Sequence, residues 1–120
     1  MANENRFDLI ITVVNKGFSD YVIETARSMG ASGATIIHGR GTGIHETDSF
    51  FGNFIQPEKD IVLILVFKKD KNKIMQEICK VSRLNEEGKG LSFSVPVNNV
   101  EGINYLTEKN KIAKINKKYK

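Results

Sequence analysis

Apolar residues recur with the spacing of strands and helices through the first hundred residues of the chain. The predicted elements are, in chain order, a strand over 7–14, a helix over 19–29, strands over 35–38 and 61–67, a helix over 74–81 and a strand over 91–97. Ser19 is expected to cap the first helix and Gly30 to end it. Lys68 to Asn72 is expected to form a turn.

This order consists of two consecutive strand–helix–strand units within 120 residues, a length that suits one domain. It predicts the split βαβ arrangement, an α+β fold of the ferredoxin-like type. In that fold a βαββαβ chain forms a four-stranded antiparallel sheet, and both helices cover one of its faces. Pro96 lacks a backbone donor, so the last strand is expected at an edge of the sheet or to end near Pro96.

The other face of the sheet also needs a cover. The strand over 61–67 is apolar on both sides. In the first strand, one face carries Phe7, Leu9, Ile11 and Val13, and we expect Ile10 and Val14 to point outward from the other. An apolar sheet face left open to water indicates a subunit interface, so the pattern predicts an oligomer.

Charge and composition place the chain among ordinary cytoplasmic proteins. Residues 104–120 carry six lysines and one glutamate, so this predicted basic tail holds a net charge of +5 and the preceding 103 residues hold −1. A tail of this kind is usually solvated, which makes nucleic acid an improbable partner. The single cysteine, Cys79, is interpreted as a core residue in a reducing compartment. The longest apolar run is too short to insert into a membrane.

Two glycine-rich segments are the candidate binding elements. Gly39-Arg40-Gly41-Thr42-Gly43 follows the second predicted strand and begins a polar and aromatic loop that extends to Asp60. Gly88-Lys89-Gly90 precedes the last strand. Glycine lets backbone amides approach an anion, and each segment adds a cation. Together they are expected to line one phosphate-sized cleft, either within a subunit or between neighbours.

Catalytic residue sets are absent from the sequence. The chain has two histidines and no nucleophile-elbow, Cys-x-x-Cys or His-x-x-x-His pattern, so no enzyme is predicted. His45, Glu46 and Asp48 in the long loop are the only group that suggests a metal, and solvated side chains are the simpler interpretation.

The order and spacing of these motifs resemble the nitrogen-regulatory P-II signal-transduction family over about residues 6–103. Met29 to Thr35 is similar to the Gly-x-x-Gly-x-Thr entry of that family into its second strand, and Gly39-Arg40-Gly41 to the opening of its T-loop. The T-loop equivalent is about residues 42–60. Gly88-Lys89-Gly90 resembles the B-loop, with Leu91 where that loop has lysine.

The resemblance implies a homotrimer that binds ATP or ADP between subunits and regulates a transporter, an enzyme or a transcription regulator through the T-loop. The residues expected to line the nucleotide cleft are Thr35, Gly39, Arg40, Gly41, Thr42, Gly88, Lys89 and Gly90. Two alternatives stay open: a metal-binding trimer of the divalent-cation-tolerance type, and a protein that contacts nucleic acid through its lysine tail.

Overall fold

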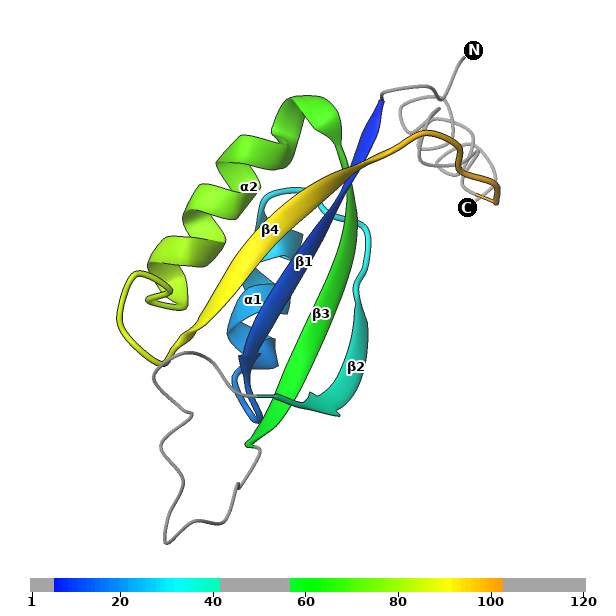
Figure 1. Ribbon diagram of the computed structural model, residues 1–120. Helices are drawn as coiled ribbons and strands as arrows, with labels where there is room; N and C mark the ends of the chain where they lie inside the picture. The colour runs from blue at the N-terminus through cyan, green and yellow to red at the C-terminus, as the bar shows by residue number, and fades with distance from the viewer. Residues whose placement is uncertain (1–5, 42–56, 103–120) are drawn as a thin grey trace, which may run out of the picture.

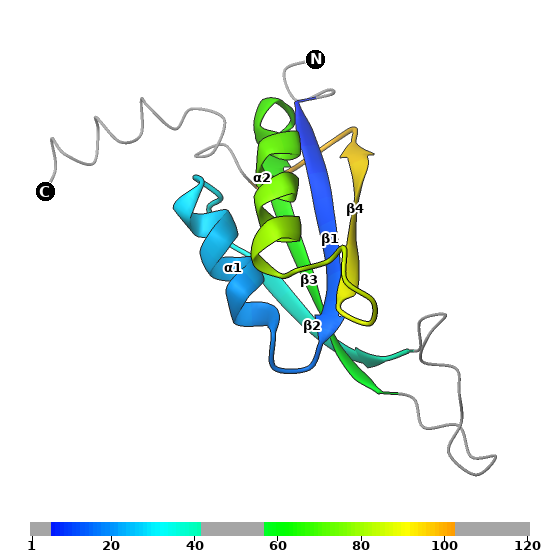
Figure 2. The same ribbon diagram turned by 90° about the vertical axis from the view of Figure 1, so that its left-hand side faces the viewer.

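The computed structural model describes residues 6–41 and 57–102. These residues form four strands and two helices, which are β1 (Phe7–Asn15), α1 (Ser19–Ser28), β2 (Thr35–Arg40), β3 (Glu58–Phe67), α2 (Lys68–Val81) and β4 (Gly90–Val97). The sheet is antiparallel with strand order β2-β3-β1-β4, as Figure 1 shows. Both helices lie on one side of it (Figure 2). The predicted ferredoxin-like fold is confirmed.

The core lies between the sheet and the helices. Its buried members are apolar side chains of β1, α1, β3 and α2, which are Ile10, Val14, Val22, Ala26, Val62, Ile64, Val66, Ile74 and Ile78. The predicted helix stripes are therefore confirmed except at Val81, which is 41 % exposed. Cys79 is half-buried and unpaired. No helix within 6–41 or 57–102 is long and apolar enough to cross a membrane.

The helices cover the face of β1 that was predicted to point away from them. Ile10 and Val14 point into the core, whereas Leu9, Ile11 and Val13 lie on the uncovered side. Both faces of β1 are rich in apolar residues, so alternation alone did not reveal which one the helices cover. Thr12, a buried polar residue of the helix-covered face, has a partner there: its hydroxyl lies 2.8 Å from that of Ser92.

The uncovered side, called here the open face, is apolar across three strands. Residues directly opposite in an antiparallel pair share a face, so the ladder identifies its rows as Phe7–Phe67–Val97, Leu9–Leu65–Val95, Ile11–Leu63–Phe93 and Val13–Ile61–Leu91. Thr35 and Ile37 extend two of these rows onto β2. Leu91 is 54 % exposed and Phe93 42 %.

Several predicted boundaries shift. Ser19 does not cap α1: Phe18 occupies the cap position without a side-chain bond, while the buried Ser19 side chain bonds Asp60. The segment predicted as a turn, Lys68 to Asn72, is the start of α2, which follows β3 directly. Gly30 is confirmed as the helix end, with φ of 101°. Pro96 lies on the edge strand β4, as predicted.

Candidate functional site

The two glycine segments lie at the same end of the sheet but at opposite edges. The end of β2 pairs with the start of β3, Lys59 of β3 pairs with Asn15 of β1, and Val14 pairs with Gly90 of β4. Three interstrand steps of about 4.8 Å separate β2 from β4, or roughly 14 Å. Figure 1 shows these ends at the bottom of the sheet, with β3 and β1 between them. One chain therefore does not bring both segments to one phosphate.

Gly39 and Arg40 belong to β2 rather than to a loop, which corrects the prediction. They are opposite Lys59 and Glu58, and the Gly41 amide donates to the Pro57 carbonyl at 3.2 Å. The strand is longer than predicted because β3 begins at Glu58, which gives β2 further partners. Thr42, together with His45, Glu46, Asp48 and most of the predicted T-loop, lies outside the described residues.

The fold itself does not require glycine at positions 39 and 41. Neither residue has a positive φ. A Cβ at Gly39 would make ordinary contact with Ile61 Cδ1 at 3.5 Å, and one at Gly41 would meet open space. A need for glycine at these two positions therefore has to come from something outside the described chain, such as a close-approaching ligand or subunit.

Gly88 and Gly90, by contrast, are required by the backbone. Their φ angles are 80° and 130°. A Cβ on Gly90 would overlap the carbonyl oxygen of Val13 on β1. Lys89 between them donates its amide to the Glu86 carbonyl at 3.3 Å. The glycines here are explained by the entry into β4, so they are weaker evidence for an anion site than their sequence pattern indicated.

Thr35 lies away from both segments. It is the first residue of β2, is exposed, and is opposite Leu63 on the open face. Five residues of strand place it about 16 Å from Arg40. Within one chain, the candidate residues thus form three separate groups, which are Thr35, the end of β2, and the turn before β4.

A chain of hydrogen bonds that the sequence did not indicate connects β3, β1 and the turn before β4 at this end of the sheet. Lys59 Nζ donates to Asn15 Oδ1 at 2.7 Å, and Asn15 Nδ2 donates to the Gly88 carbonyl at 2.9 Å. Lys59 is buried although it is a lysine. The only sequence signal was a lysine just before an apolar run. This chain of hydrogen bonds holds the turn before β4 against the end of β1.

Asp60 is the buried centre of a second polar cluster at the same end of the sheet. Its carboxylate accepts a bond from the Gly17 amide at 3.1 Å and from His38 Nδ1 at 2.8 Å, and it also bonds Ser19. Burial acts to raise the pKa of Asp60, but these hydrogen bonds and the nearby His38 charge outweigh it and hold the pKa below its usual value. The cluster joins β2 and β3 to the turn before α1.

Replacing Asp60 with asparagine is expected to lower the free energy of unfolding at pH 7 by about 1–3 kcal/mol, because the hydrogen-bond network loses its negative charge and one of its two acceptor oxygens. A carboxylate with a lowered folded pKa contributes stability above its unfolded pKa, near 3.9, and this contribution is lost as the pH falls through the folded value. The difference between the two proteins should therefore shrink below about pH 4. Urea unfolding at pH 7 and pH 3 measures it, with the exposed Glu24→Gln as control. A deficit that is equally large at both pH values would contradict this account.

Metal-binding residues do not gather in the described part of the chain: no three His, Cys, Asp or Glu residues of 6–41 and 57–102 form a group that suits a metal ion. The lysine tail, residues 104–120, lies outside the described residues. Neither alternative function gains support from the described geometry.

These observations define the class of protein. It is a ferredoxin-like domain with an open apolar sheet face and glycines at the ends of its strands. A family model described as "Nitrogen regulatory protein P-II" matches residues 7–105. The chain belongs to the P-II family, whose members are non-enzymatic signal transducers. The resemblance read from the sequence is thereby confirmed.

Among solved structures, the chain is similar to Arabidopsis thaliana PII, crystallised bound to citrate. The TM-score is 0.66 with 23 % sequence identity, and the match covers 82 % of this chain and 84 % of the plant protein. At this identity the match supports the fold. A comparison with curated proteins finds no significant match.

Proposed function

We propose that this protein is a cytoplasmic regulator that binds an adenine nucleotide, ATP or ADP, in clefts between the subunits of a homotrimer. Nucleotide binding would set how the segment between β2 and β3 contacts a regulated transporter, enzyme or transcription regulator, such as one in nitrogen metabolism. Membership of the P-II family is the observation that carries the proposal.

The open face supports the oligomer. A monomer would leave Leu91, Phe93 and Val95 between 39 % and 54 % exposed, in the same patch as the half-buried residues of β1 and β3. Exposed apolar patches of this kind mark interaction sites in soluble proteins. A second and third copy of the sheet would remove this surface from water.

The arrangement of strand ends supports a cleft between subunits. The end of β2 and the turn before β4 lie on opposite edges of one sheet, so one edge of a subunit has to meet the other edge of its neighbour to bring them together. Arg40 is exposed at one edge, and Lys89 lies at the other. Such a junction would place two cations and several backbone amides around a phosphate group.

Gly39 and Gly41 provide the sharpest test of nucleotide binding, because neither is needed for the fold of one chain. The variants Gly39→Ala and Gly41→Ala are expected to keep the melting temperature of the ligand-free protein within a few degrees. Their affinity for ATP, measured by calorimetry, should fall at least tenfold, or about 1.4 kcal/mol, because the added methyl group blocks close approach. Asn72→Ala on the exposed side of α2 is the control.

ATP or ADP should also raise the melting temperature of the wild-type protein, since a ligand that binds only the native state stabilises it. The absence of any shift with either nucleotide, at concentrations up to several millimolar, would refute the proposed ligand. Unchanged ATP affinity in both glycine variants would instead reject this location for the site.

A further inference from the structure

The first six residues of α2 carry four lysines and one acid, which are Lys68, Lys69, Lys71, Lys73 and Asp70. The positive end of the helix dipole lies at this terminus and disfavours cations there. Lys69 and Lys73 also repel each other, because residues four apart are neighbours on a helix. These charges lower the stability of the helix, and a local cost of this kind indicates a functional role.

The acids beside these lysines neutralise them only in part. The buried Asp8 carboxylate lies 3.9 Å from both Lys68 Nζ and Lys71 Nζ, and Lys69 Nζ lies 3.7 Å from the Asp70 carboxylate. All three distances exceed that of a hydrogen bond. The side chains of Lys68 and Lys69 are 52 % and 78 % exposed. Their ammonium groups therefore remain able to donate to a partner that approaches from solvent.

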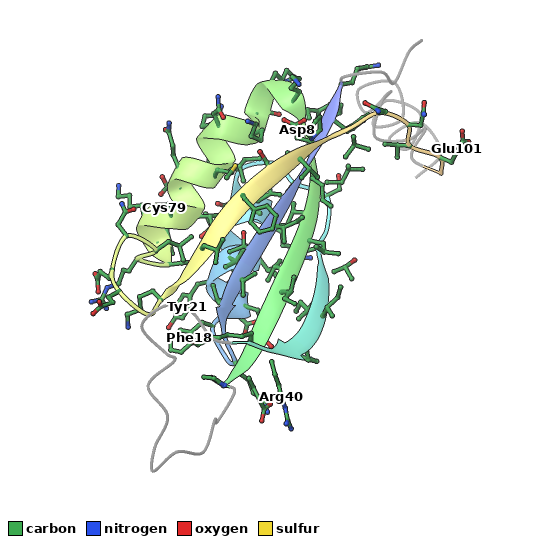
Figure 3. All side chains as sticks on the ribbon, viewed as in Figure 1. Asp8, Phe18, Tyr21, Arg40, Cys79 and Glu101 are labelled. Atoms are coloured by element: carbon green, nitrogen blue, oxygen red, sulfur yellow. The ribbon has the colours of Figure 1, made fainter. Side chains whose placement is uncertain are left out.

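The sequence continues into its lysine-rich tail from the same end of the domain. β4 ends beside the start of β1, where α2 also begins, and Figure 3 shows Asp8 and Glu101 at this end. Residues 104–120 follow, with a net charge of +5. Arg6, the first six residues of α2 and this tail are called here the basic end. With Asp8 and Glu101 included, the basic end holds a charge of +7 and the rest of the chain −3.

Threefold symmetry would place three basic ends at one level, a step that rests on the homotrimer proposed above. A rotation axis leaves the height of an atom along that axis unchanged, so the three copies of Lys69 would lie in one plane perpendicular to it. Such an array can present three cationic clusters to a flat surface at once. A curved nucleic-acid duplex or a single acidic peptide would meet fewer of them.

We propose that the basic end binds the surface of a membrane that contains anionic phospholipids, with the lysines of α2 at the lipid headgroups. Clusters of four to eight lysines or arginines are typical of such binding. The tail sequence places Ile112, Ile115 and Tyr119 among its lysines, a composition that suits the boundary between headgroups and acyl chains. Binding is peripheral and uses charge rather than a membrane-spanning helix.

This orientation narrows the choice of regulated partner. The segment between β2 and β3 is attached at Arg40 and Glu58, at the opposite end of the sheet from the start of α2. The nine residues of β1 separate the two ends by about 30 Å. With the basic end on the membrane, this segment would point away from the lipid. Its target is then a soluble protein, or a soluble domain, rather than the membrane-embedded part of a transporter.

Sedimentation of the full-length protein with lipid vesicles tests the proposal, in the absence of nucleotide. Vesicles of phosphatidylcholine mixed with phosphatidylserine should bind the protein in about 0.1 M salt and release it in about 1 M salt, since the Debye length falls from about 10 Å to about 3 Å. The combined variant Lys68→Gln, Lys69→Gln and Lys73→Gln should bind about tenfold more weakly or worse. Its melting temperature should be unchanged or higher, because the helix dipole disfavours these cations.

The combined variant Lys16→Gln, Lys80→Gln and Arg83→Gln is the matched control. It removes the same charge from the opposite end of the domain and should bind the vesicles with less than about a threefold change. The proposal is overturned if the wild-type protein does not sediment with the anionic vesicles, if it binds vesicles of phosphatidylcholine alone equally well, or if the α2 variant binds as tightly as the control.

Tighter binding to duplex DNA than to the anionic vesicles, at the same salt concentration, would overturn the choice of lipid in favour of nucleic acid. The vesicle assay contains no ATP or ADP, so its failure would leave the proposed nucleotide site standing. Equally, a protein that shows no thermal shift with nucleotide would still give a clear result with vesicles.

Discussion

Replacing Leu63 with glutamate is expected to convert the proposed trimer into monomers. Leu63 lies on the central strand β3, opposite Ile11 of β1 and Thr35 of β2 on the open face. Burying a carboxylate without a partner in an apolar interface costs several kcal/mol for each charge, and every subunit would contribute one. The dissociation constant should rise at least a thousandfold, or about 4 kcal/mol. Light scattering after size-exclusion chromatography measures the change.

The monomer produced by this substitution is expected to stay folded, because Leu63 is only half-buried in a single chain and takes no part in the core beneath the helices. Circular dichroism tests that point. Glu24→Lys, on the exposed side of α1, is the control and should remain trimeric. A trimer that survives Leu63→Glu would show that the open face is not the interface, and a monomeric wild-type protein would remove the proposed intersubunit cleft.

Replacing Gly90 with alanine is expected to destabilise the protein by about 3 kcal/mol or more. The added Cβ would overlap the Val13 carbonyl oxygen and lie 3.2 Å from both Val13 C and Val14 Cα. These atoms belong to the central strand β1, which pairs with β3 on one side and β4 on the other, so the backbone has little freedom to move. The φ of 130° adds strain for any residue with a side chain.

Gly88→Ala separates these two causes. Gly88 has a φ of 80° but open space around its Cβ position, so its substitution should cost only about 1–2 kcal/mol. Urea unfolding of both variants gives the comparison. Equal losses would show that backbone strain alone explains the glycines, and a negligible loss at Gly90 would contradict the close approach of β4 to β1.

The glycine motifs illustrate how far a local pattern can be interpreted. Gly-x-Gly motifs occur in two segments of the chain, and the sequence suggested one role for both segments. The structure separates them: Gly90 is required by the neighbouring strand, whereas Gly39 and Gly41 have room for a side chain. The difference depends on which strand lies beside each glycine, and a three-residue motif does not contain that information.

The sequence by itself determined the class of fold and the family. Alternation in β1 and β4, a continuous apolar run in β3 and helical spacing in α1 and α2 specify a βαββαβ order, because strands and helices bury side chains with different periods. The glycine motifs, at their spacing along that order, were sufficient to indicate the P-II family, and the match over residues 7–105 confirms it.

Tertiary structure alone decided which face of the sheet the helices cover. Both faces of β1 and β3 are rich in apolar residues, and a period of two distinguishes the faces without ranking them. The outcome depends on how Val22, Ala26, Ile74 and Ile78 of the helices pack against the side chains of one face of the sheet. The same kind of distant contact forms the Asp60 cluster, where residues far apart in the chain meet only after the sheet has formed.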